Sequence, residues 1–311
     1  MTLAILCPGQ GPQHPKMFAL TGDAPEAEGL FAHAATLLGG RDPREMVQTD
    51  ADEILHHNRV GQILCTLQAL AAAAALRHVM PGRLIVAGYS VGEVAAWGVA
   101  GLLDMTDTLD LVARRAETMD SASPLGDGLL FVRGLSRGAV EGLCKRHDAA
   151  VAIVSPGDAY VLGGASAPLD ALADEAKKMG SARVVRVAVT VASHTHRLAA
   201  ASEEFRKILN DVSIKPVPRA GVRLLSGIDG SSVIDTAAGV GKLAEQISHT
   251  VQWADCLESC LEGGTNAFLE LGPGRALTEM AAGAYPDIPA RSLEDFKTLQ
   301  GARAWLARLA S

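Results

Sequence analysis

The 311-residue chain carries 28 Lys and Arg against 35 Asp and Glu, for a formal net charge of −7, and 48% of its residues are hydrophobic. This is enough apolar sequence for a large buried core, and the interleaved charges exclude a nucleic-acid surface built on a concentrated basic stripe. No apolar run is typical of a membrane span or a signal peptide, and five cysteines without a CxxC pair are typical of a reduced, cytoplasmic protein.

Taken in chain order, short apolar runs predict buried strands and longer stretches predict helices. The first part of the chain predicts a strand at 3–7, a helix at 62–80, a strand at 84–87 and a helix at 106–120. The last part predicts helices at 197–211, 236–248 and 252–262 and a strand at 266–271. Continuous Val/Ile/Leu runs of this kind indicate an α/β protein with a buried parallel sheet.

The middle of the chain has a different rhythm. It predicts a strand at 128–135, a helix at 138–147, strands at 150–154 and 159–163, a helix at 168–179 and a strand at 182–189. This βαββαβ order is typical of a ferredoxin-like unit. We therefore predict a ferredoxin-like subdomain at 126–191, inserted in a larger α/β domain formed by 1–125 and 192–311.

A possible nucleophile follows the second predicted strand. Gly88-Tyr89-Ser90-Val91-Gly92 is a GxSxG sequence between a strand and a helix, the setting of a nucleophile elbow. Its glycines allow the strand and helix to approach closely, and the N–H of Val91 at the helix start could help to hold an oxyanion. The motif predicts that Ser90 is a nucleophile.

A serine hydroxyl needs a base, and nine histidines are available. His194 and His196 are the best placed, because they lie after a predicted strand and before a predicted helix. Periodicity does not choose between them. No Asp or Glu between Ser90 and His194 clearly occupies a strand-end loop, so the orienting acid is either hidden or replaced by a backbone carbonyl.

These features occur with several further motifs in one order. Pro8-Gly9-Gln10-Gly11-Pro12-Gln13 precedes the elbow; Arg115, Val191-Ala192-Ser193-His194, Val251-Gln252-Trp253 and Glu270-Leu271-Gly272-Pro273-Gly274 follow it. Together they resemble the malonyl-CoA:acyl-carrier-protein transacylases and the acyltransferase domains of polyketide synthases, nearly end to end. The resemblance implies an α/β-hydrolase-like large domain and a malonyl transfer from coenzyme A to an acyl carrier protein, with coenzyme A thioester as substrate and without cofactor or metal.

The resemblance also implies roles for individual residues. Ser90 is the nucleophile, His194 the base, and the backbone carbonyl of Gln252 orients the histidine. The N–H groups of Gln10 and Val91 form the oxyanion hole, and Arg115 pairs with the malonyl carboxylate. Residues expected to line the acyl pocket are Gln62, Tyr89 and Ser193.

This sequence departs from the family pattern at three positions. Tyr89 replaces the usual histidine of the elbow, Val154 replaces an asparagine, and Ala116 follows Arg115 where glycine is usual. These departures leave the acyl group open between malonyl and methylmalonyl. They also keep two alternatives in view: a malonyl transferase subunit of a malonate decarboxylase, and an acyl-CoA thioester hydrolase.

A carrier protein is acidic, so its docking surface needs basic residues. One candidate cluster is Lys177, Lys178, Arg183, Arg186, Arg197, Arg206 and Lys207. Ordinary solvated helix faces explain this cluster equally well.

Overall fold

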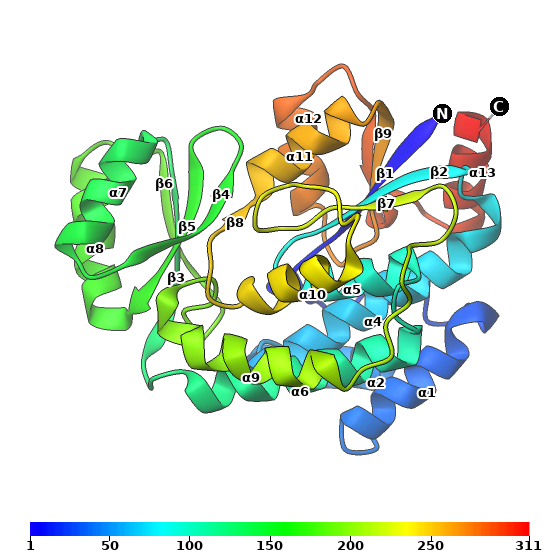
Figure 1. The fold of residues 1–311 in the computed structure, drawn as a ribbon, viewed down its shortest axis with the longest axis horizontal. Coiled ribbons are helices and arrows are strands. Elements are labelled where there is room, and N and C mark those ends of the chain that lie inside the picture. The colour runs from blue at the N-terminus through cyan, green and yellow to red at the C-terminus, as the bar shows by residue number, and fades with distance from the viewer. Residues whose placement is uncertain (311) are drawn as a thin grey trace.

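The structure, a computed structural model, describes residues 1–310 and contains two sheets, each covered by helices (Figure 1). The large sheet is parallel and has the strand order β10-β9-β1-β2-β7. Its strands are β1 (Thr2–Cys7), β2 (Arg83–Gly88), β7 (Val222–Leu224), β9 (Thr265–Glu270) and β10 (Ala290–Ser292). The sequence prediction of an α/β fold with a parallel sheet is confirmed.

Apolar runs form the centre of the large sheet because both of its faces are covered. Leu3 to Cys7 of β1 are fully buried, as are Val86 and Ala87 of β2. Helices α4 to α6 and α9 and α10 pack on one side of this sheet, and α11 and α12 on the other (Figure 1). The α-helices around it are α1 (Glu28–Leu37), α2 (Pro43–Thr49), α3 (Asp52–Leu55), α4 (Asn58–Leu76), α5 (Gly92–Ala100), α6 (Met105–Ala122), α9 (Ala199–Asn210), α10 (Thr236–Glu245), α11 (Trp253–Glu262), α12 (Ala276–Ala284) and α13 (Leu299–Ala310).

The small sheet has the order β6-β3-β5-β4-β8. Its elements are β3 (Asp127–Arg133), α7 (Arg137–Arg146), β4 (Ala150–Ser155), β5 (Ala159–Ala165), α8 (Ser166–Lys178), β6 (Arg183–Val187) and β8 (Val251–Gln252). The first four strands are antiparallel and alternate with α7 and α8 as the βαββαβ pattern predicts. The fifth strand, β8, comes from outside the predicted insertion and pairs parallel with β4, which joins the small sheet to the start of α11.

Among residues 1–310, one helical segment has the length and composition of a membrane span: residues 58–79, which comprise α4 and the following turn. Within that span 83% of the most apolar window is buried inside the protein. This segment is therefore a core helix of the α/β fold. The five cysteines are free and buried.

Candidate active site

Ser90 lies in the tight turn between β2 and α5. Its φ of 58° places it in the left-handed region, which a side chain other than glycine adopts only when its surroundings enforce it. The two glycines of the motif make the turn possible, because a Cβ on Gly92 would lie 2.0 Å from the Cys7 carbonyl oxygen and one on Gly88 2.2 Å from the Glu93 nitrogen. The segment therefore has the geometry of the predicted nucleophile elbow.

His194 is the histidine that reaches the serine. The Ser90 hydroxyl lies 2.7 Å from His194 Nε2, and His194 Nδ1 lies 2.6 Å from the Gln246 carbonyl oxygen. Because a carbonyl only accepts, Nδ1 carries the proton and Nε2 is free to accept from the serine. His196, the other candidate, begins a short 3₁₀ helix (His196–Leu198) and its side chain is exposed.

The carbonyl that orients His194 belongs to Gln246, so the sequence-based choice of Gln252 was wrong. Both glutamines lie between α10 and α11, six positions apart. The chain turns directly after α10, and the Ile247 carbonyl also accepts from the His194 N–H at 2.7 Å. Gln252 instead lies on β8, where its N–H donates to the Gly227 carbonyl at 2.8 Å and its neighbour across the ladder is Val154.

The side chain of Gln246 connects three parts of the site, and sequence reasoning did not single it out. Its Nε2 donates to the Ser90 carbonyl and to Glu93 Oε2, both at 2.8 Å, and its Oε1 accepts from Arg115 at 3.1 Å. Burial raises the pKa of Glu93 to about 7, against hydrogen bonds from the Gly227 backbone and from Gln246. One residue thus holds the nucleophile turn, the histidine and the arginine together.

Arg115 is the charged group of the site. It comes from α6, is 1% exposed, and donates to Gln62 Oε1 at 2.7 Å as well as to Gln246. Burial lowers its pKa to about 10, with the more distant Glu93 acting in the opposite direction, so the guanidinium stays charged at neutral pH. It forms no ion pair within residues 1–310, and its Nε has no hydrogen-bond partner there. A buried, unpaired guanidinium is costly unless an anion joins it.

Gln62, predicted from the resemblance, fixes that arginine. Its side chain is fully buried on α4, and its Nε2 donates to Asn58 Oδ1 at 2.8 Å. The amide orientation that satisfies Asn58 leaves Oε1 facing Arg115. Gln62 therefore contacts the charge rather than the serine.

Ser90, His194 and Arg115 face one narrow cavity of about 60 Å³. The small sheet supplies most of its apolar wall, so the two sheets enclose the site together. The full lining is Gln10, Tyr89, Ser90, Arg115, Met119, Leu129, Ile153, Val161, Val187, Val189, Val191, Ser193 and His194. The cavity brings together six of the nine predicted site residues, while Gln62 and Val91 lie directly behind its wall and Gln252 does not reach it.

The two predicted oxyanion donors have free N–H groups. Among residues 1–310, neither the Gln10 N–H nor the Val91 N–H donates to a protein acceptor. Val91 is buried and directly follows Ser90, and Gln10 lines the cavity beside it. Free N–H groups at this position suit an oxygen that gains negative charge during a reaction.

Tyr89, which stands where the family usually has histidine, packs edge-on against Trp253 with ring centroids 5.4 Å apart. Burial raises the pKa of Tyr89 to about 12, against a smaller effect of its contact with the Ser155 side chain. Its hydroxyl is therefore neutral at physiological pH and serves as a fixed wall of the cavity. Ser193 is also buried and lines the same wall next to His194.

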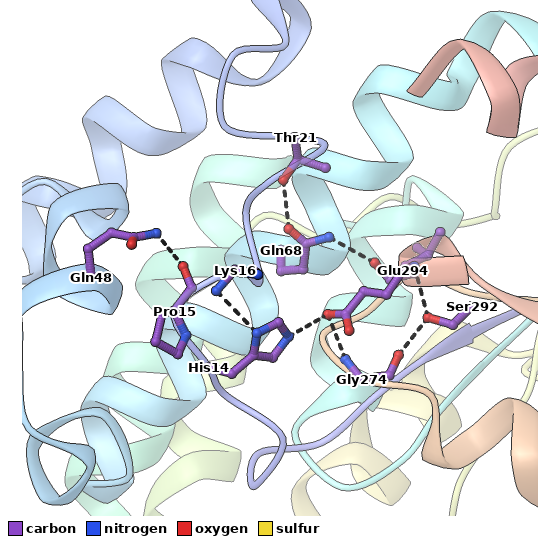
Figure 2. A network of polar contacts seen from close by, with 10 residues as sticks. His14, Pro15, Lys16, Thr21, Gln48, Gln68, Gly274, Ser292 and Glu294 are labelled. Atoms are coloured by element: carbon purple, nitrogen blue, oxygen red, sulfur yellow. Dashed lines mark hydrogen bonds and ion pairs between the residues drawn. The ribbon is translucent and has the colours of Figure 1, made fainter. Parts of the chain in front are cut away.

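A second polar network lies at His14, directly after the loop that carries Gln10 (Figure 2). His14 Nδ1 accepts from the Lys16 N–H at 3.1 Å, so Nε2 donates to Glu294 at 2.9 Å. The same Glu294 oxygen accepts from the Gly274 N–H at 2.9 Å. The segment directly after the first Gly/Pro loop is thus joined to the second, at Gly274.

Comparisons with known proteins agree with this geometry. Residues 45–296 match the model of the acyl transferase domain family. A malonyl CoA-acyl carrier protein transacylase from Haemophilus influenzae is 29% identical over 97% of this chain and 98% of its own length. MCAT from Mycobacterium tuberculosis, known from a crystal structure, is 28% identical in sequence, and the alignment covers 100% of this chain and 100% of that one with a TM-score of 0.88. A malonyl-transacylase solved with its type II polyketide synthase acyl-carrier protein is 25% identical over 98% of this chain and 99% of its own, with a TM-score of 0.90.

A GxSxG elbow, a paired histidine and a buried arginine on this two-sheet fold define a serine acyltransferase. The chain belongs to the acyl transferase domain family. Its full-length similarity is to enzymes that carry malonyl groups between coenzyme A and acyl carrier proteins. Within residues 1–310, no group of three or more His, Cys, Asp or Glu side chains could hold a metal ion.

Proposed function

We propose that this protein transfers a malonyl group from malonyl-CoA to the thiol of an acyl carrier protein, in fatty-acid or polyketide synthesis. The observation that supports a malonyl substrate is the environment of Arg115. Its guanidinium is a buried and unpaired cation on the wall of the cavity that holds Ser90 and His194. An acyl group that ends in a carboxylate supplies the missing anion. Its five cysteines are free and buried, which agrees with an enzyme of the reducing cytoplasm.

The first half-reaction makes an ester on Ser90. His194 Nε2 takes the hydroxyl proton as Ser90 Oγ attacks the thioester carbonyl, whose oxygen becomes negative and accepts from the N–H groups of Gln10 and Val91. The tetrahedral intermediate collapses, the carbon–sulfur bond breaks, and the proton on His194 goes to the leaving thiolate of coenzyme A. The Gln246 carbonyl stabilises the transient imidazolium.

The second half-reaction reverses these steps with another thiol. The carrier thiol gives its proton to His194 and its sulfur attacks the Ser90 ester. The ester carbon–oxygen bond breaks and Ser90 regains the proton. One histidine is base and then acid in both halves, which is the chemistry of a ping-pong transferase.

The carboxylate of the malonyl unit supplies the anionic partner that Arg115 lacks within the protein. A planar guanidinium donates two parallel hydrogen bonds to a carboxylate, and Gln62 and Gln246 already hold its orientation. An acyl group without a carboxylate leaves this charge buried and unpaired. The site therefore discriminates by charge rather than by size alone.

Intact-protein mass spectrometry tests this function. Brief exposure to malonyl-CoA should add one malonyl group to the wild type and none to Ser90→Ala, and a holo carrier protein should remove it. In Arg115→Ala, kcat/KM for malonyl-CoA should fall by about 10- to 100-fold, because the charge-assisted hydrogen bonds to the carboxylate are lost. The same variant should use acetyl-CoA as well as the wild type does, or better. Arg114→Ala is the matched control, because Arg114 is adjacent on α6 but exposed.

The same experiment separates transfer from hydrolysis. A hydrolase releases free malonate at a comparable rate without carrier protein, whereas a transferase holds the ester until the carrier thiol arrives. Retained malonyl selectivity in Arg115→Ala would show that the arginine does not bind the carboxylate.

The division of the chain is part of this proposal. We place a large catalytic domain at 1–125 and 192–311 and a subdomain at 126–191. The helix–strand order supports it, since β3 begins at Asp127 and β6 ends at Val187. The cavity between the two sheets is then a site that neither part forms alone.

A further inference from the structure

Glu93 is a buried carboxyl group that the reaction steps above do not use. It is the second residue of α5, three positions after Ser90, and is 1% exposed. An acidic residue in the first turn of a helix interacts favourably with the helix dipole even at the surface, so the dipole does not explain this burial. Glutamate is almost never buried to this degree without a partner. Its contacts in the core therefore explain its position.

The Glu93 carboxyl group accepts from two donors. Gln246 Nε2 donates to Oε2 at 2.8 Å, and the Gly227 N–H also donates to the carboxyl group. Glycine at position 227 allows this close approach, because a Cβ there would lie 2.5 Å from Glu93 Oε2. Within residues 1–310 the carboxyl group forms no ion pair, and Arg115 acts on it only from farther away. Hydrogen bonds rather than a counterion hold it in place.

These contacts use every hydrogen-bonding group of the Gln246 side chain. The two protons of its NH₂ group go to the Ser90 carbonyl and to Glu93 Oε2, both at 2.8 Å. Its Oε1 is left to accept from Arg115 at 3.1 Å. A reversed amide would turn the NH₂ group towards the guanidinium and Oε1 towards two acceptors. The surroundings therefore permit one orientation of this amide.

The orientation does not require a charge on Glu93. Burial raises the pKa of Glu93 to about 7, with smaller opposing effects of Arg115 and Asp229, so both forms are present at neutral pH. When the carboxyl group is protonated on its other oxygen, Oε2 still accepts from Gln246. The remaining titratable neighbour is the Cys256 thiol, whose pKa is raised by burial. The acceptor oxygen is thus the property of Glu93 that fixes the amide.

We propose that Glu93 is a positioning residue for acyl selectivity: it fixes the Gln246 amide, which holds the Arg115 guanidinium in the orientation that binds an acyl carboxylate. This inference rests on the proposed function and adds to it a residue that does not line the Ser90 cavity. Gln62 fixes one nitrogen of the guanidinium at 2.7 Å, and Gln246 fixes the other. Two fixed points set the plane in which a guanidinium donates to a carboxylate.

Substitutions that remove or keep the acceptor at position 93 provide the test. Single-turnover acylation of Ser90 gives kcat/KM for malonyl-CoA and for acetyl-CoA. In Glu93→Met, the ratio of the two should fall roughly 10-fold, as expected when a hydrogen bond to a charged group is lost, while the value for acetyl-CoA stays close to that of the wild type. Glu93→Gln keeps an oxygen acceptor and should retain at least the wild-type ratio.

Gly227→Ala tests the same contact without altering Glu93. Its added Cβ displaces Glu93 Oε2, so the malonyl-to-acetyl ratio should fall in the same direction as in Glu93→Met. This variant keeps the proposal testable even where Glu93→Met does not fold. An unchanged ratio in folded Gly227→Ala would contradict the role of the contact.

A double-mutant cycle shows whether Glu93 acts through Gln246. Gln246→Met removes the amide and keeps the backbone carbonyl that accepts from His194 Nδ1. This variant should lose selectivity by itself, and adding Glu93→Met should change the ratio little further. Independent losses that multiply in the double variant would show that Glu93 does not act through the amide, which would overturn the proposal.

Glu270 on β9 is the matched control. It is also buried, burial raises its pKa to about 7, and it accepts from the N–H and the hydroxyl of Thr278. It does not line the Ser90 cavity. Glu270→Met should lower the free energy of unfolding, because buried donors lose their acceptor, and should leave the malonyl-to-acetyl ratio unchanged. Urea unfolding of this variant and of Glu93→Met measures the loss of stability that the two share.

The remaining outcomes are also decisive. A wild-type ratio in folded Glu93→Met, or an equal loss in Glu93→Gln and Glu93→Met, would show that the acceptor at position 93 does not position Arg115. Equal falls in Glu93→Met and Glu270→Met would mean that the ratio follows stability alone. Failure of the proposed function looks different, because the wild type would then form no malonyl ester on Ser90 or would show no preference for malonyl-CoA.

Discussion

His194 occupies surroundings that keep its imidazole neutral. It is 1% exposed, and burial lowers its pKa to about 3, with the nearby Arg115 charge acting in the same direction and the Gln246 carbonyl in the opposite one. A neutral imidazole is the form that can accept a proton from Ser90. In the free enzyme, His194 is therefore neutral and able to act as a base at pH values far below the ordinary histidine pKa.

This environment predicts an unusual pH dependence. The rate of Ser90 acylation should stay flat on the acid side between about pH 5 and 8, where a solvated histidine would begin to protonate near 6.5. In Arg115→Ala with acetyl-CoA, the acid limb should move to higher pH because a neighbouring positive charge is gone. Single-turnover acylation over this pH range is the measurement. A wild-type acid limb centred near 6.5 would contradict the assigned environment.

The residue scale also shows what sequence could and could not predict. Ser90, His194 and Arg115 were predicted because motifs carry them, and the structure brings all three to one cavity. Gln246 was missed because its importance depends on the turn after α10, which points its carbonyl at His194 and its amide at Arg115. Nothing in the spacing of Gln246 and Gln252 distinguishes which carbonyl faces the histidine.

At the scale of elements, the active site depends on how closely β1 and α5 approach. Gly92 begins α5 directly against the carbonyl groups of Cys7 and Pro8, and a Cβ there would lie 2.0 Å from the first and 2.7 Å from the second. Backbone atoms cannot move aside as side-chain ends can. The elbow and the Gln10 loop after β1 are therefore set by the same contact.

Gly92→Ala should lower the free energy of unfolding by about 3 kcal/mol or more, since overpacking against backbone forces the helix away from the strand. Gly29→Ala is the control: Gly29 is exposed on α1 with nothing within 4 Å of its added Cβ, and the change should stabilise the protein by about 0.5–1 kcal/mol. Urea unfolding measures both. If both substitutions changed the free energy of unfolding equally, the close contact between β1 and α5 would not be what requires glycine at position 92.

Elements with strong periodicity were predicted close to their observed limits. The runs at 3–7 and 84–87 became β1 and β2, and the βαββαβ order became the antiparallel part of the small sheet. The two-residue strand β8 lacked such a signal, because its pairing with β4 joins positions about a hundred residues apart. Pairings of this kind are decided by tertiary packing rather than by local pattern.

At the scale of the whole molecule, the small sheet must keep a fixed position over Ser90. Besides the β4–β8 pairing, Arg197 holds it through two hydrogen bonds of 2.7 Å to the carboxylate of Asp127, the first residue of β3. The Asp127 side chain is 1% exposed. Arg197 follows His194 by three positions, so this pair fixes the histidine segment to the strand that supplies the cavity wall.

Arg197→Met should lower the free energy of unfolding by about 3–5 kcal/mol, because it leaves the Asp127 carboxylate buried and unpaired. The double variant Arg197→Met/Asp127→Asn should recover much of that loss, since it removes the buried charge as well. Acylation of Ser90 should slow in the single variant even where the protein is fully folded, because the histidine segment loses its attachment to β3. Urea unfolding and single-turnover acylation of the two variants measure these effects. A loss below about 1 kcal/mol, typical of exposed ion pairs, would mean that β8 alone positions the small sheet.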